Sequence, residues 1–181
     1  MPSIFGVVIL VVMGYTIGSI RIINQGTEAL VERLGRYHRK LKPGLNFIVP
    51  FLDVIVLRDS VREQLLEIYP CSATTRDQVN VSIDVIIFWR VLELELAYYA
   101  IEDVEKAINE VVVIALRSEI NKLELDLVLP SLDFLDRMLL SYLDEATEPW
   151  GIKVTRVEVR EIMPSTPTRK VYGHSNLIDI G

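Results

Sequence analysis

The side chains that could carry out chemistry in this sequence are few and far apart. His38 lies in a run of basic residues and His174 lies close to the C-terminal end, so neither suits a Ser/His/Asp triad. Cys71 is the only cysteine and follows a proline in an expected loop. A single thiol excludes a disulfide framework and a zinc site built from several thiolates. We therefore predict no catalytic residue, no cofactor-binding residue and no metal site.

Carboxylate pairs are the other candidates for acid–base chemistry. Glu93/Glu95 and Glu124/Asp126 are each two residues apart, in segments that we expect to be extended or looped. Such pairs are more often solvated charges than a general acid and base. The sequence also contains no GxSxG, GxxxxGK[ST] or HExxH pattern. These observations predict that the protein is not an enzyme.

The composition restricts the class of protein. The chain has 181 residues, of which 50% are hydrophobic and 24% charged, with a net charge of -6. This length suits one domain plus an appendage, and this much apolar surface disfavours long disorder. An acidic balance argues against a nucleic-acid-binding domain, which carries a basic surface. No nucleic-acid partner is therefore expected.

Residues 3–20 form a run without any charged side chain. As a helix this run would be about 27 Å long, close to the ~30 Å hydrocarbon core of a bilayer. We predict that residues 1–20 are an N-terminal membrane anchor and that the protein is single-pass. A cleaved signal peptide stays possible as an alternative, although nothing before Arg21 supplies a basic flank; a buried core helix fits less well. The anchoring side chains are Ile4, Phe5, Val7, Val8, Ile9, Leu10, Val11, Val12, Met13, Ile17 and Ile20.

Basic residues follow the apolar run, and acidic residues gather farther along the chain. Residues 21–42 carry six Lys or Arg against two Glu, whereas residues 101–148 carry twelve Asp or Glu against four Lys or Arg. The positive flank predicts that the domain lies on the cytoplasmic side, near anionic headgroups. The alternative is that both are ordinary solvated faces. The membrane-proximal candidates are Arg21, Arg33, Arg36, Arg39, Lys40, Lys42, Phe47 and Phe51.

A proline- and glycine-punctuated loop lies within this basic region. Pro43, Gly44 and Pro50 predict turns around a short extended piece. The apolar side chains between and after them either dip into the headgroup region or, for most of them, fill the core of the domain. They are Leu45, Phe47, Ile48, Val49, Phe51 and Leu52.

The remaining pattern predicts an α+β domain. Extended runs are expected at 28–34, 54–58, 61–68 (closed by Pro70) and 78–90. Helices are expected over 104–120, with Asp103 as N-cap, and from Ser131 as N-cap to about residue 148. A final strand over 152–162 changes phase, which predicts a β-bulge near Thr155-Arg156. We predict a mostly antiparallel sheet with two main helices.

Seven blocks of this sequence resemble the stomatin/prohibitin-like family, whose shared unit is the band 7 or SPFH domain. The resemblance covers residues 21–164 and is closest to bacterial or organellar stomatin homologues with one N-terminal hydrophobic segment. The blocks are LVERLGRY (30–37), LKPGLNFIVPFLD (41–53), VREQLL (61–66), TRDQV (75–79), AYYAIEDV (97–104), LRSEINKLELD (116–126) and DEATEPWGIKVTRVEVREI (144–162).

The resemblance implies a fold and a role. It implies an SPFH domain preceded by a membrane helix, without catalytic activity or cofactor. It also implies a scaffold that forms homo- or hetero-oligomers with other band 7 proteins. Such a scaffold organises membrane lipids and membrane proteins such as proteases or channels.

The C-terminal segment departs from the family pattern. Family members continue into a long charged helix, whereas residues 165–181 contain Pro167 and Gly173 and show no heptad. We therefore expect an irregular tail. The alternative function is a truncated, monomeric, membrane-tethered binding module that modulates the assembly of full-length relatives.

Overall fold

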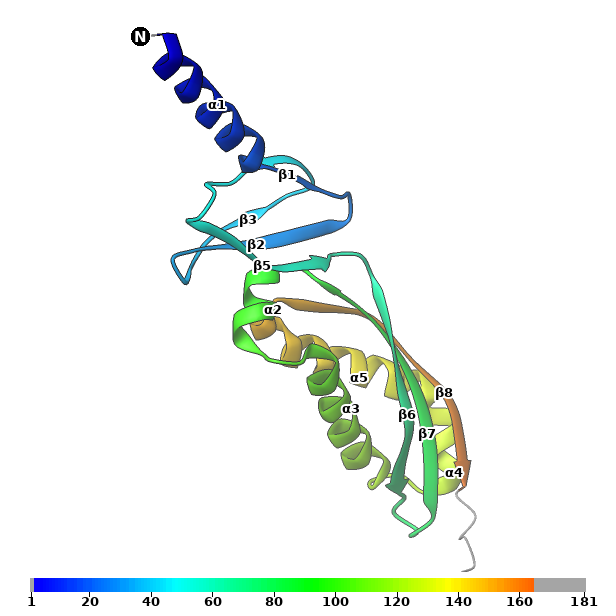
Figure 1. Cartoon of the computed structure of the whole chain (residues 1–181). Coiled ribbons are helices and arrows are strands. Elements are labelled where there is room, and N and C mark those ends of the chain that lie inside the picture. Colours follow the sequence, from blue (N-terminus) through cyan, green and yellow to red (C-terminus); the bar gives the residue numbers. More distant parts are fainter. Residues whose placement is uncertain (1, 165–181) are drawn as a thin grey trace, which may run out of the picture.

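The computed structural model describes residues 2–164, and these residues form an α+β arrangement (Figure 1). The expected tail at 165–181 lies outside the described residues. The elements in chain order are α1 (Pro2–Ser19), β1 (Ile20–Ile23), β2 (Thr27–Arg33), β3 (Arg36–Leu41), β4 (Gly44–Phe47), β5 (Asp53–Ser60), β6 (Gln64–Thr74), β7 (Asn80–Val91), α2 (Leu94–Ala100), α3 (Val104–Ile120), α4 (Leu125–Val128), η1 (Leu129–Ser131), α5 (Leu132–Thr147), η2 (Glu148–Trp150) and β8 (Ile152–Pro164).

The strands pair antiparallel, as predicted, but they are divided among separate sheets. Strand β1 pairs with β4, the order β3-β2-β5 forms a second sheet, and β6-β7-β8 forms a third. Two glycines with positive φ lie where the chain passes between the first two sheets. Gly26 lies in the turn before β2, and Gly44 begins β4. In Figure 1, α1 projects beyond the small sheets, and the long β6-β7-β8 sheet lies at the other end.

The main core lies between the β6-β7-β8 sheet and the helices α3 and α5, which cover one of its faces (Figure 1). Alternate residues of β7 point into this core, as expected for a strand with one covered face. Both helices contribute apolar residues at four-residue spacing, which places them on one side of each helix. The fully buried residues include Ile83 and Ile87 on β7, Ile108, Val112 and Leu116 on α3, and Leu135, Leu139 and Leu143 on α5.

The two main helices confirm the sequence prediction, with one difference at a cap. The Asp103 carboxylate accepts the backbone N–H of Lys106 at 3.0 Å and caps α3 as expected. Ser131 occupies the N-cap position of α5, but its hydroxyl instead donates to the Leu127 carbonyl at 2.6 Å. Leu127 lies in α4, so the serine hydroxyl bonds to a preceding carbonyl instead of capping the N–H groups of α5.

The bounds of β6 differ from the predicted 61–68, and one bulge agrees with the prediction. Pro70 does not end β6, which continues to Thr74 with a register irregularity between Ile68 and Cys71. A proline is tolerated there because β6 is an edge strand and the irregularity removes the need for its missing N–H. On β8, Thr155 bulges out between the partners of Phe88 and Trp89, where the change of phase predicted it.

A glycine corner connects α5 to β8. Gly151 has φ +67°, and its carbonyl accepts the N–H groups of Leu92 and Glu93 at 2.9 and 3.0 Å. A Cβ at this position would lie 2.7 Å from the Glu93 carbonyl oxygen. Glycine is therefore required both for its backbone conformation and for the close approach. Trp150 packs against the main core.

A second, smaller core lies beneath the two small sheets and is formed by Ile23, Ala29, Val31, Leu41 and Ile48. Helix α2 joins this part of the chain to the rest. The Tyr99 hydroxyl donates to Glu32 Oε1 at 2.7 Å, which raises the pKa of Tyr99 to about 12. The rings of Tyr37 and Tyr99 meet edge to face, with centroids 6.2 Å apart.

Candidate membrane-facing surface

Helix α1 is apolar on every side, and none of the elements in residues 2–164 packs along its length. Ten of the predicted anchoring side chains lie on it and are 53–74% exposed. A surface helix of a soluble protein normally has one apolar face and one polar face, whereas α1 has no polar face. The ten are Ile4, Phe5, Val7, Val8, Ile9, Leu10, Val11, Val12, Met13 and Ile17.

The expected transmembrane helix is not supported. Within residues 2–164, no helix is both long enough and apolar enough to cross a membrane. Helix α1 has 18 residues, and at ~1.5 Å per residue it is about 27 Å long, short of the ~20 residues typical of a spanning helix. The eleventh predicted anchoring residue, Ile20, lies in strand β1 rather than in the helix.

Hydrogen bonds fix the C-terminal end of α1 to the small sheets. The Ile48 N–H donates to the Ser19 carbonyl at 2.8 Å. The Arg21 guanidinium donates to the carbonyls of Gly18 and Ile20 at 3.2 and 2.9 Å. A positive charge at a helix C-terminus is favourable because it faces the negative end of the helix dipole. The base of α1 is thereby fixed in position relative to the domain.

The β1–β4 ribbon displays apolar side chains next to this base. Ile20 pairs with Phe47 and Ile22 pairs with Leu45, and paired residues two positions apart share one face of a ribbon. Ile22, Leu45 and Phe47 are 67%, 60% and 57% exposed. The opposite face holds Ile23, which is buried in the smaller core.

The loop that follows β4 adds a further exposed ring. Phe51 is 98% exposed and has φ +70°, a left-handed conformation that bulky side chains rarely adopt. The loop abuts α1, since a Cβ on Gly18 would lie 3.9 Å from Pro50 Cγ. We use the term apolar collar for Ile22, Leu45, Phe47 and Phe51, the exposed apolar side chains around the base of α1.

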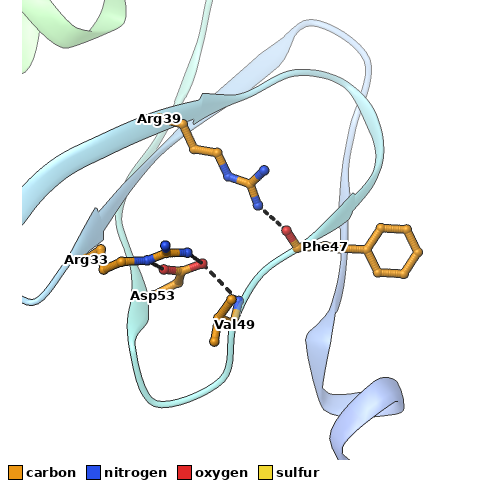
Figure 2. Close-up of polar contacts among 5 residues, drawn as sticks. All are labelled: Arg33, Arg39, Phe47, Val49 and Asp53. Carbon is orange, nitrogen blue, oxygen red and sulfur yellow. Dashed lines mark hydrogen bonds and ion pairs between the residues drawn. The ribbon is translucent and has the colours of Figure 1, made fainter.

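A partly buried ion pair holds this loop in place (Figure 2). Arg33 and Asp53 are cross-strand partners on β2 and β5, and their side chains join at 2.6 Å (Nε to Oδ1) and 3.1 Å (Nη2 to Oδ2). Asp53 Oδ2 also accepts the Val49 N–H at 2.8 Å. The hydrogen bonds from Arg33 and Val49 lower the pKa of Asp53 to about 2, against the opposing effect of burial. The carboxylate therefore stays charged and links the start of the loop, at Val49, to its end at Asp53.

The predicted basic residues divide into paired and free groups. Arg33 pairs with Asp53, and Lys40 pairs with Glu28 at 3.1 Å. Arg39 donates to the Phe47 carbonyl, while the Phe47 ring points away from the polar groups (Figure 2). The other three, Arg21, Arg36 and Lys42, are exposed. The structure thus places the predicted residues around one end of the domain, but with two of their charges already neutralised.

Sequence reasoning missed part of this surface. The loop side chains were expected mostly to fill the core, yet only Ile48 is buried, and Leu45, Phe47, Phe51 and Leu52 are exposed. Asp53 was not singled out, although an aspartate ending a proline-punctuated loop is a recognisable signal for a side chain that accepts loop N–H groups. Ile22 was missed because its face depends on the pairing with β4.

The described residues offer little for catalysis. Within residues 2–164, no group of three or more His, Cys, Asp or Glu side chains could hold a metal ion. Glu93 has an extended backbone and precedes α2, whereas Glu95 lies within the helix, so the expectation of an extended or looped segment was wrong for Glu95. Glu124 lies 3.8 Å from Arg76 as part of an exposed ion pair.

The chain is similar to a known protein family and to several individual proteins. Residues 21–173 match the family described as SPFH domain / Band 7 family. The chain is 39% identical over 161 residues to an uncharacterized protein of Methanocaldococcus jannaschii, which covers 89% of this chain and 79% of that protein. An uncharacterized protein of Methanothermobacter thermautotrophicus is 36% identical over 158 residues (87% and 49%). Stomatin-like protein 2, mitochondrial, of Homo sapiens is 36% identical over 133 residues (74% and 37%), so the chain spans less than half of these last two relatives.

Proposed function

Because the chain belongs to the SPFH domain / Band 7 family, we propose that it acts as a membrane-associated scaffold without catalytic activity. The observation that carries this proposal is the continuity of α1 with the apolar collar. A uniformly apolar helix and the exposed rings at its base present one contiguous apolar region at one end of the chain. Exposed apolar surface of this extent indicates contact with a membrane or a protein partner.

The arrangement supports lipid as the contact. Removal of apolar surface from water contributes about 25 cal/mol per Å², so α1 and the collar gain most when surrounded by hydrocarbon. Arg21, Arg36 and Lys42 are exposed, Arg21 directly before Ile22 of the collar, and such free positive charges suit anionic headgroups. The backbone of Phe51 supports the same conclusion, because a strained conformation that displays an apolar ring to water is a signal of function.

We propose further that α1 inserts into the bilayer and that the domain stays on the cytoplasmic side. Self-association, alone or with other band 7 proteins, and recruitment of membrane proteases or channels are also parts of the proposal. The similarity to stomatin-like relatives supports these parts at the level of the family.

The insertion can be tested with single-cysteine labelling. Cys71 is buried and is replaced by alanine, and a cysteine with an environment-sensitive fluorophore is then introduced at Phe51. The full chain is reconstituted into vesicles that contain lipids brominated near the headgroup. We expect strong quenching at position 51, because bromine atoms quench a fluorophore only at short range.

The matched control is Phe134→Cys. Phe134 is a 51% exposed phenylalanine on α5, in the other part of the chain. We expect little quenching there. Equal quenching at the two positions, or none at position 51, would contradict the proposed orientation.

Self-association is tested separately, by chemical crosslinking. Chemical crosslinking of the full chain in membranes should give a ladder of species beyond a dimer. A strictly monomeric pattern would refute the scaffold and would favour the monomeric, membrane-tethered module.

A further inference from the structure

A broad groove lies at the junction of the two parts of the domain, away from the apolar collar. It has a volume of about 1240 Å³ and is lined by the end of β5, by β7, by α2 and by the first turns of α3. In Figure 1 these elements meet where α2 lies beneath the β3-β2-β5 sheet. The groove is large enough for several residues of a peptide, since ligand pockets typically measure about 300–1,000 Å³.

The floor of the groove is apolar. Trp89, Val91 and Leu94 line it and are 4%, 5% and 1% exposed. Tyr98 and Tyr99 border it and are 40% and 49% exposed. Exposed tyrosines beside a buried apolar floor are typical of surfaces that bind peptides, because each ring offers contact area at a low entropic cost.

The rim of the groove is acidic. Its charged lining residues are Asp59, Glu102, Asp103, Glu105, Lys106 and Glu110, an excess of negative charge. Asp103 is partly occupied as the cap of α3, whereas Glu102, Glu105 and Glu110 are exposed and form no ion pair within residues 2–164. One sign of charge along a concave surface concentrates the electrostatic potential and attracts cations.

We propose that this groove binds an extended, basic peptide segment of a partner protein. Lys or Arg side chains of the segment pair with the rim, and an apolar side chain contacts the floor. The negative rim disfavours nucleic acids and anionic lipids. The inference rests on the proposed scaffold role and deepens it, because it names a class of partner.

The test measures peptide binding to the full chain in phosphatidylcholine nanodiscs, which carry no net lipid charge. The probe is a fluorescein-labelled peptide of alternating lysine and leucine, and its anisotropy reports binding; empty nanodiscs provide the background. We expect saturable binding that weakens with salt. Exposed ion pairs are individually weak, so the removal of three rim charges in E102Q/E105Q/E110Q should weaken binding about tenfold.

The chain offers a matched control for this variant. The control D126N/D133N/E145Q also removes three charges from exposed carboxylates, and Asp133 matches Glu105 as the acidic residue in the first turn of a main helix. It should bind the peptide as the unmodified chain does.

Four results would overturn the inference. The first three are an absence of saturable binding, equal binding of a glutamate–leucine peptide, and equal weakening in the control variant. The fourth is that E102Q/E105Q/E110Q no longer forms the crosslinked ladder while the unmodified chain binds no peptide. The last result would assign the groove to a second copy of this chain. Membrane insertion is measured separately by quenching at position 51, so a failure of the scaffold proposal is distinguishable from a failure of this one.

Discussion

Replacement of Asp53 by asparagine removes one charge and one acceptor oxygen from the ion pair that holds the collar loop. The carboxylate now makes two contacts to Arg33 and one to the Val49 N–H. Hydrogen bonds to charged groups contribute about 1.5–3 kcal/mol. Because the Arg33 side chain is 37% exposed, solvent screening reduces the expected effect to about 1–2 kcal/mol.

The effect should be local and should appear in amide hydrogen exchange. The N–H of Val49 reports opening of the loop directly, since its acceptor is Asp53. At about 1.4 kcal/mol per factor of ten, D53N should speed exchange at Val49 roughly 5- to 30-fold. Amides of the main core, such as that of Ile87, should be unaffected.

Asp59→Asn provides the control, because Asp59 lies on the same strand, is exposed and forms no ion pair within residues 2–164. It should leave exchange at Val49 unchanged. Unchanged exchange in D53N, or an equal increase in the two variants, would show that the ion pair does not hold the loop.

Three further predictions concern stability. Gly151→Ala should destabilise the domain by about 2–4 kcal/mol, because φ +67° strains any side chain and the Cβ would lie 2.7 Å from the Glu93 carbonyl oxygen. Thermal unfolding followed by circular dichroism measures the loss, and an unchanged midpoint would contradict the prediction. Leu139→Ala should lower the free energy of unfolding, measured by urea titration, by about 2–5 kcal/mol because Leu139 is fully buried. Phe134→Ala, at an exposed position, should lower it much less, and equal losses would contradict the position of the core. The pKa of Asp53 is lowered to about 2 in the folded chain, so its stabilisation is complete above about pH 4 and is lost as the pH falls toward 2. The decrease in stability over this range should therefore be smaller in D53N than in the unmodified chain, and an equal decrease would contradict the assignment.

The main helices and the long central strand could be predicted because their signals are local. On α3 and α5, apolar residues recur at three and four positions, and Asp103 caps a helix within three residues of its own position. The bulge at Thr155 was likewise visible as a change of phase within one strand. Such patterns depend on neighbours in the sequence, so no knowledge of pairing is needed to interpret them.

The division into three sheets could not be predicted in this way. Whether β4 pairs with β1 or extends the β3-β2-β5 sheet depends on contacts between residues far apart in the chain. The ion pair of Arg33 and Asp53 has the same origin, because it exists only in the register that places the two residues opposite each other. The exposure of Ile22 likewise follows from the pairing of β1 with β4, which explains why the sequence analysis did not select it.

The irregularity at Pro70 has a consequence for how copies of this domain can meet. Proline has no N–H, and the shift in register between Ile68 and Cys71 bends the outer edge of β6. Both features hinder the addition of a foreign strand along that edge. If copies gather on a membrane, extension of one continuous sheet from protomer to protomer through β6 is disfavoured, and their contacts at this edge should be made by side chains. Close crowding of these domains would then carry little risk of fibrous aggregation through this strand.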